Sequence, residues 1–180
     1  GTNLFPGAVH PEGYRYLQSF SKHLFPHFIY ETGGVRLQKT IAAVNGENTT
    51  LILYEVLEAP AVFTLSLQPF MAGRDYHGLM IANDAIGQHL EFENDILTAS
   101  LYDNLPELYL CVPNSEFTAN PQWYFNFEYP VEKYRRQDFQ EDLFTPGTFK
   151  LQLKSGDQLG VIISLRHPAD RNAFDLLERE

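Results

Sequence analysis

The alternation of apolar and polar residues along the chain predicts β-strands. In residues 61–67 and 148–154 an apolar side chain occupies every second position, which is the period of a half-buried strand. Residues 51–57 and 159–165 are apolar on both faces, as expected of strands that are covered on both sides. Further strands are predicted at residues 28–31, 35–44, 96–102, 107–112 and 122–127.

Three turn signals separate these apolar runs. Gly33-Gly34, Asn45-Gly46 and Ser155-Gly156-Asp157 each offer residues that tolerate the positive φ angles of tight hairpins. We therefore expect the segments on either side of each turn to pair antiparallel. The later part of the chain is expected to be interrupted by the prolines at positions 121, 130 and 146.

Only the C-terminus has the pattern of a helix. Pro168 suits a first turn, Asp170 lies at its positive end, and Ala173, Phe174 and Leu177 fall on one face. Many short strands with almost no helix predict an all-β fold, an antiparallel β-sandwich of the supersandwich kind with a short C-terminal helix.

Composition narrows the function. The chain has 180 residues, enough for one domain, and a net charge of -10, which argues against nucleic acid and anionic membranes as partners. Neutral sugars remain compatible with that charge. Cys111 is the only cysteine, so no intrachain disulfide can form and a reducing, cytoplasmic location is expected. The chain starts at Gly1 rather than Met, which suggests a part of a longer polypeptide.

Pairs of carboxylates are the first candidates for catalysis, since glycoside hydrolysis needs two. Glu91 and Glu93 would lie about 6.7 Å apart on one strand face, yet their surroundings have the composition of a solvated edge or turn. Glu141 and Asp142 are adjacent and would point to opposite faces, which favours a hydrogen-bonding or capping role. We predict no catalytic residue in this chain.

Motifs for metals and cofactors are missing from the sequence. No His-Glu-x-x-His or paired Cys-x-x-Cys pattern occurs, and Pro26 interrupts any helical register between His23 and His27. Neither a nucleophile elbow nor a phosphate-binding loop occurs. We expect no metal and no cofactor.

A polar segment, Arg74, Asp75, Tyr76 and His77, directly follows a predicted strand, where a loop would hold it at a sheet end. Arg donates, Asp accepts, and Tyr adds a flat face with a hydroxyl, a combination that suits sugar hydroxyls. The alternative is an Arg-Asp bridge that only locks the loop.

An aromatic run at residues 123–127 offers a second candidate surface. Strand alternation would place Trp123, Phe125 and Phe127 on one face, with Tyr124 and Asn126 on the other. One face could then form core while the other binds. The alternative for Trp123 is a structural role in the core, without contact to a ligand.

Eight short motifs in order, spread over about residues 3–150, resemble the N-terminal domain of bacterial and archaeal-type glycogen debranching enzymes of the amylo-α-1,6-glucosidase family. They are His10-Pro-Glu-Gly-Tyr14, Phe28-Ile-Tyr-Glu31, Gly34-Val-Arg-Leu37, Gly46-Glu-Asn-Thr-Thr50, Arg74-Asp-Tyr-His77, Trp123-Tyr-Phe-Asn-Phe127, Glu141-Asp-Leu-Phe144 and Pro146-Gly147. The chain departs from the family at Arg136, where the family usually has Gly, which puts the local turn and a ligand role of Asp138 in question.

The resemblance implies a non-catalytic sandwich domain at residues 1–166, with residues 167–180 leading toward an α/α-barrel catalytic domain that is absent from this chain. It implies α-glucan (glycogen) and that barrel as partners, with sugar held by Arg74, Asp75, Tyr76, His77, Tyr124 and Asn126. This chain alone is then expected not to hydrolyse glycogen. The alternative is a purely structural domain that forms an interface with the barrel or with a second copy of this chain. A third hypothesis is that the chain is a complete enzyme.

Overall fold

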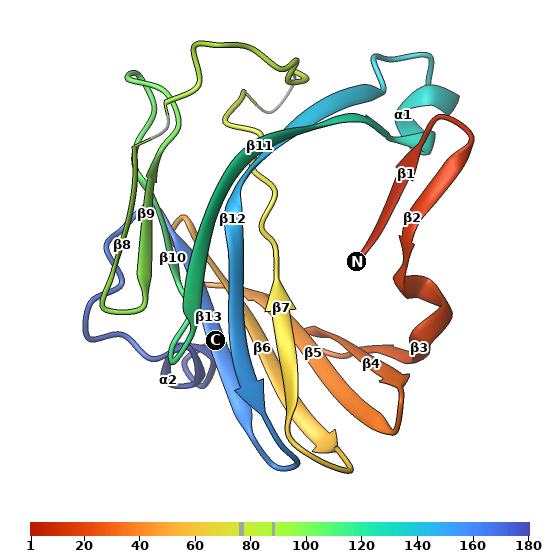
Figure 1. The fold of residues 1–180 in the computed structure, drawn as a ribbon, viewed down its shortest axis with the longest axis vertical. Helices are drawn as coiled ribbons and strands as arrows, with labels where there is room; N and C mark the ends of the chain where they lie inside the picture. Colours follow the sequence, from red (N-terminus) through yellow and green to blue (C-terminus); the bar gives the residue numbers. More distant parts are fainter. Residues whose placement is uncertain (76–77, 88) are drawn as a thin grey trace.

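The computed structural model describes residues 1–75, 78–87 and 89–180, and they form an antiparallel, mostly β fold (Figure 1). This confirms the predicted fold class. The strands are β1 (Thr2–Phe5), β2 (Ala8–Glu12), β3 (Leu17–Lys22), β4 (Pro26–Thr32), β5 (Val35–Ala43), β6 (Thr49–Glu58), β7 (Phe63–Leu67), β8 (His89–Glu93), β9 (Ile96–Ser100), β10 (Leu108–Cys111), β11 (Glu116–Glu128), β12 (Gln140–Leu153) and β13 (Gln158–Ser164).

The larger layer is an eight-stranded sheet in the order β3-β4-β5-β6-β13-β10-β9-β8. The hairpins predicted at Gly33-Gly34 and Asn45-Gly46 join β4 to β5 and β5 to β6, and both pairs are antiparallel, as expected. β6 and β13 lie in the middle of this sheet and contribute to a core on each face. This explains why their sequences carry apolar residues on both sides.

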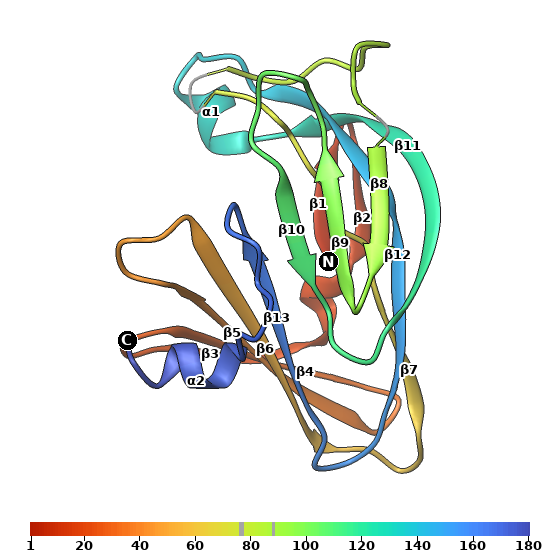
Figure 2. The same ribbon diagram turned by 90° about the vertical axis from the view of Figure 1, so that its left-hand side faces the viewer.

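The smaller layer is a three-stranded sheet in the order β11-β12-β7, which lies over part of the larger sheet (Figures 1 and 2). Between the two layers the main core gathers Phe144, Phe149 and Leu151 from β12 with Leu97 from β9 and Val161 from β13. Because the two facing sides of the sheets are apolar, stacking the sheets removes both sides from water. The β-sandwich prediction is confirmed.

The turn at Ser155-Gly156-Asp157 corrects one expectation. β12 and β13 do not pair with each other, because β12 belongs to the smaller sheet and β13 to the larger. The turn instead carries the chain from one layer to the other. It is fixed against β6, whose Val56 donates to Asp157 and accepts from Gly156 through the backbone. A turn sequence specifies a chain reversal, but not that its two arms share a sheet.

Two of the prolines expected to interrupt the later strands lie inside them. Pro121 is within β11 and Pro146 within β12, where the register between the two strands shifts between Ala119 and Gln122. The missing N–H groups of proline are tolerated at such irregularities. Gly147 is required here, because a Cβ would stand 2.2 Å from the Thr118 carbonyl oxygen.

Three short helical segments occur in the described residues: η1 (Gly13–Tyr16), α1 (Pro130–Tyr134) and α2 (Ala173–Leu177). The first two were not predicted; Pro130 opens α1 rather than only breaking a strand. Arg136 adopts a φ of 61°, the left-handed conformation that glycine adopts most readily, so this turn forms with an arginine in place.

The C-terminal helix begins later than Pro168. Its N-cap is Asn172, whose side chain accepts from the backbone N–H groups of Phe174 and Asp175. Ala173 and Leu176 pack on the outer face of the larger sheet, where they form a second, smaller core. The boundary between residues 166 and 167 stays a prediction.

The first three strands and β8 were also not predicted. Most residues of β2 and all residues of β3 are exposed, so they lack the alternation that a buried face imposes. β8 is the edge strand of the larger sheet, and the solvated character predicted for Glu91 and Glu93 is confirmed by their exposure on it.

Candidate functional site

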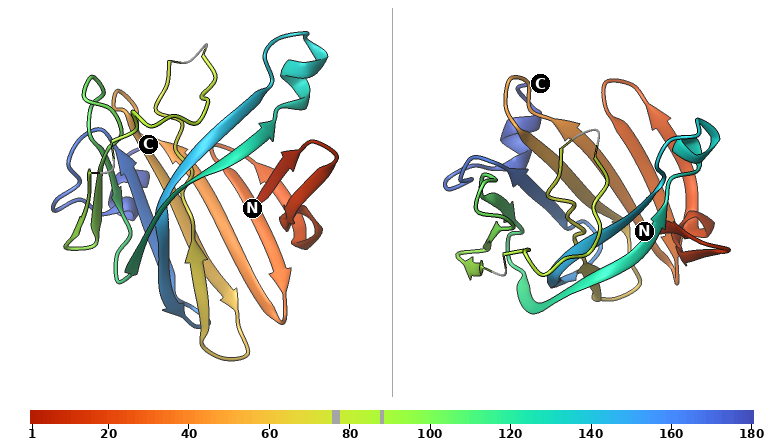
Figure 3. Two further views of the ribbon diagram at one scale, coloured as in Figure 1. Left: turned by 45° about the horizontal axis from the view of Figure 1, so that its top comes forward. Right: turned by 90° about the horizontal axis from the view of Figure 1, so that it is seen from above.

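The long connection between β7 and β8 runs beside the upper part of β12 (Figure 3) and is fixed to it by backbone hydrogen bonds. Met71 and Phe144 exchange two such bonds, with N···O distances of 2.8 and 3.0 Å. Further along, Asp142 N–H donates to the Met80 carbonyl at 2.8 Å. The segment that contains Arg74 and Asp75 is therefore attached to β12 on both sides.

A buried carboxylate stands at the centre of this attachment. The side chain of Glu141, at the beginning of β12, is only 1% exposed. Arg74 contacts it with two guanidinium nitrogens, one to each carboxylate oxygen, and the Tyr129 hydroxyl donates to Oε2. The Met80 N–H donates to Oε1 at 3.1 Å. We call these four residues the Glu141 cluster.

The cluster sets the charges of its members. Burial by itself would raise the pKa of Glu141, but the hydrogen bonds from Arg74, Tyr129 and Met80 and the charge of Arg74 outweigh it, so the pKa is lowered. The pKa of Tyr129 is raised to about 12 by burial and by its bond to the carboxylate. Glu141 is therefore an ionised structural group and not an acid ready to give up a proton.

Asp142 points to the opposite side of β12 and performs a second attachment. Its two carboxylate oxygens accept backbone N–H groups from Ala82, at 3.0 Å, and from Asn126 in β11, at 2.8 Å. The hydrogen-bonding role predicted for Glu141 and Asp142 is confirmed. Asp142 thereby places the β7–β8 connection next to the aromatic end of β11.

A bulge in β11 overturns the predicted alternation of the aromatic run. Tyr124 pairs with Leu143 and Phe127 with Glu141, so two residues of β11 stand opposite Asp142 alone. Asn126, in the bulge, has a φ of 61°, which asparagine tolerates better than most residues. Phe125 is consequently 56% exposed instead of sharing a buried face with Phe127.

The aromatic contacts follow from this bulge. Tyr124 and Phe127 both pack against Phe70, with ring centroids 5.1 and 5.3 Å apart, although simple alternation would separate them. The Tyr124 hydroxyl also accepts from Gln68 at 3.2 Å. Trp123 packs edge-on against Phe144 in the main core, as its structural interpretation predicted.

The six predicted site residues have different outcomes. Arg74 does lock the loop, but through Glu141, 67 residues away, a partner that the local sequence could not reveal. Asp75 is exposed, and its carbonyl accepts from Arg74 and Gly78. Tyr76 and His77 lie outside the described residues. Tyr124 is half-buried and Asn126 is exposed, close to the same loop.

Other chemistry finds little support in the described residues. Glu91 and Glu93 both face solvent, while Phe92 between them packs on Phe117 and Phe149. Among the residues that the structure describes, no group of three or more His, Cys, Asp or Glu side chains could hold a metal ion. No helix among these described residues is long and apolar enough to cross a membrane.

Comparison with known proteins agrees with the motifs. The family described as glycogen debranching enzyme N terminal matches residues 1–160, which include strands β1 to β12, the first residues of β13 and the Glu141 cluster. No curated protein matches the chain. Since the match covers most of the sequence, the chain belongs to the family of glycogen debranching enzyme N-terminal domains.

Proposed function

We propose that this domain helps a glycogen debranching enzyme to recognise its α-glucan. The observation that carries the proposal is the double hydrogen bond of Asp142, which fixes the β7–β8 connection and the β11 bulge side by side. Binding groups held by a buried scaffold lose little entropy when a ligand arrives.

The groups presented there suit a neutral sugar. Asp75 and Asn126 are exposed and polar, and Phe125 offers an exposed ring on which a pyranose can stack. Tyr124 supplies a hydroxyl beside them, and Tyr76 and His77 are proposed to contribute from the same loop. We call Asp75, Tyr124, Phe125 and Asn126 the rim. Arg74 acts here as a positioning residue, because its guanidinium is engaged with Glu141.

The remaining parts of the proposal concern the rest of the enzyme. The domain packs on a C-terminal α/α-barrel that holds the catalytic acid and base, and residues 167–180 lead toward it. This chain alone does not cleave glycogen, and the enzyme works in the cytoplasm. Support comes from the family match and from the exposure of Glu91 and Glu93 on an edge strand, where neither is shielded from water.

A purely structural domain is the second candidate, and one observation favours it. Tyr14, Tyr16, Leu17 and Phe20, on η1 and β3, are between 38% and 55% exposed and lie close together in sequence. Exposed aromatic residues of this kind are common at protein interfaces. They would suit a contact with the catalytic domain or with a second copy of this chain.

Titration of the purified chain with maltoheptaose, followed by calorimetry, tests the first candidate. Phe125→Ala and Asn126→Gly remove rim groups while keeping the fold, because Gly accepts the positive φ at position 126. We expect each variant to weaken binding at least fivefold. Tyr16→Ala, which removes a comparably exposed ring on η1, is the control. The proposal is contradicted if the wild-type chain does not bind maltoheptaose. It is also contradicted if both rim variants bind it as tightly as the wild type does.

A further inference from the structure

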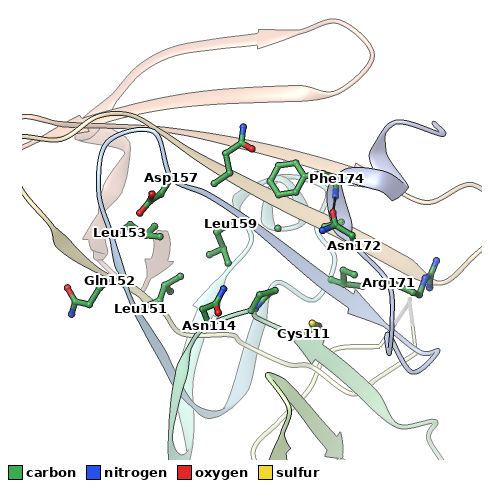
Figure 4. Close-up of a pocket in the computed structure, with 15 residues that line it drawn as sticks. Cys111, Asn114, Leu151, Gln152, Leu153, Asp157, Leu159, Arg171, Asn172 and Phe174 are labelled. Carbon is green, nitrogen blue, oxygen red and sulfur yellow. Dashed lines mark hydrogen bonds between the residues drawn. The ribbon is translucent and has the colours of Figure 1, made fainter.

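A cavity of about 440 Å³ lies away from the rim, where β10 ends and α2 crosses β13 (Figure 4). β10 pairs with β13 only as far as Cys111 and Ile162, and the chain then turns away through Pro113. The stretch of β13 from Gln158 to Val161 is thus left without a strand neighbour on this side. The volume of the cavity lies within the range typical of small-molecule sites.

The C-terminal helix forms one wall of this cavity because β13 carries a glycine beneath it. A Cβ at Gly160 would stand 2.6 Å from the Cβ of Ala173, so any side chain there would push the helix outward. The close approach brings the Phe174 ring and the Asn172 amide to the cavity. In Figure 4 these two residues lie across the cavity from Asn114.

The polar groups around the cavity are mostly uncharged amides. The side chains of Asn114 and Gln158 are exposed and have no hydrogen-bond partner among the described residues. The side-chain oxygen of Asn172 caps α2. The side-chain N–H groups of Asn172 make no hydrogen bond among the described residues.

The two charged residues of the wall are already engaged. Asp157 Oδ2 accepts from the Lys154 N–H at 2.9 Å, and Arg171 Nη2 donates to Glu47 at 2.8 Å. Arg171 Nη1, in contrast, is buried and has no partner among the described residues. A ligand hydroxyl at this wall would give that nitrogen an acceptor, while the charge of the Arg171 guanidinium is already balanced by Glu47.

We propose that this cavity is a second carbohydrate subsite that takes one or two glucose units of an α-glucan. Amides both donate and accept, which matches the hydroxyls of a neutral sugar, and the Phe174 ring gives a face for stacking. The proposal depends on the proposed function only for the class of ligand. The cavity shares no lining residue with the rim, so binding at the two places can be tested separately.

Two-dimensional ¹H–¹⁵N NMR of the chain with maltoheptaose tests the subsite. We expect saturable shifts of the side-chain amide signals of Asn114, Gln158 and Asn172. The double variant Asn114→Gly, Gln158→Ala should weaken binding at least fivefold, as read at the remaining Asn172 amide signal and at the backbone amides of the cavity; glycine is chosen at position 114 because its φ is 58°. Gln18→Ala, which removes an exposed amide on β3, is the matched control and should change nothing.

The outcome separates this subsite from the rim. Shifts confined to Phe125, Asn126 and their neighbours overturn the subsite and leave the proposed function standing. Shifts confined to the cavity support the subsite and overturn the rim, and no shift at either place overturns both. If the double variant does not fold, the map of shifts in the wild-type chain and the single Gln158→Ala variant decide the matter.

Discussion

Two pairs of carboxylates on strands of this protein have opposite surroundings. Glu91 and Glu93 are two residues apart on the edge strand β8 and both face solvent. Glu141 and Asp142 are adjacent at the beginning of β12 and point to opposite sides, where Glu141 accepts four hydrogen bonds and Asp142 accepts two. The first pair has the spacing expected for glycoside hydrolysis. The second pair has the hydrogen-bonded surroundings, with Glu141 buried.

The comparison teaches that neither spacing nor a shifted pKa identifies a catalytic group by itself. Glu91 and Glu93 have a suitable spacing but face solvent on an edge strand. Glu141 has a lowered pKa because an ion pair and two neutral donors hold it in place, and structural ion-pair networks shift pKa values as active sites do.

Removal of the buried carboxylate should have the largest effect. Glu141→Ala leaves the Arg74 guanidinium without its main partner and the Tyr129 hydroxyl and Met80 N–H without an acceptor. We expect the free energy of unfolding to fall by about 3 kcal/mol, as for other broken buried ion pairs. Urea denaturation followed by circular dichroism measures it. A loss below about 1 kcal/mol would show that the cluster is dispensable.

Acid should weaken the wild-type protein through the same group. A carboxylate whose pKa is lowered on folding adds stability above its unfolded pKa, and this stability is lost as pH falls through the folded value. For Glu141 the loss therefore begins near its ordinary pKa of 4.5 and continues below it. The stability gap between wild type and Glu141→Gln should narrow over this range in urea titrations. A gap that is constant from pH 6 to pH 3 contradicts the mechanism.

Truncation of the second attachment should have an intermediate effect. Asp142→Ala leaves the N–H groups of Ala82 and Asn126 without their acceptor, which we expect to cost about 1 to 2 kcal/mol, since both are at least partly reached by water. Hydrogen exchange at these two amides measures the loss locally. Their exchange should accelerate while amides of β6, far from the rim, keep their protection.

Neutralisation of the exposed pair should have the smallest effect. Glu91→Gln and Glu93→Gln, singly or together, should change the free energy of unfolding by less than about 0.5 kcal/mol, because both side chains are solvated. The same variants should leave maltoheptaose binding unchanged. A marked loss of either property would show that this pair has a role that its exposure does not suggest.

Local sequence signals predicted the local features well. Gly33-Gly34 and Asn45-Gly46 form hairpins as expected, because the turn and the apolar arms agree. Ser155-Gly156-Asp157 has similar turn chemistry, yet its arms enter different sheets. What distinguishes these cases is the pairing of β13 with β6, which lies about a hundred residues earlier in the chain. No property of the turn itself records that choice.

The candidate site shows the same limit. Its motifs lie on two segments that the structure places side by side, but the alternation rule misplaced Phe125 and Phe127 because the bulge at Asn126 is not visible in the apolar pattern. The partner of Arg74 was missed for a related reason, since Glu141 reaches it only after β12 has been placed beside the β7–β8 connection.

The sequence by itself determined that this chain is an antiparallel β protein of the debranching family, because strand period, turn residues and ordered motifs are written in neighbouring positions. The tertiary structure decided which strands share a sheet, which acid is buried, and which aromatic ring faces water. These depend on contacts between distant segments, whose register is set by the stacking of two sheets and by one inserted residue.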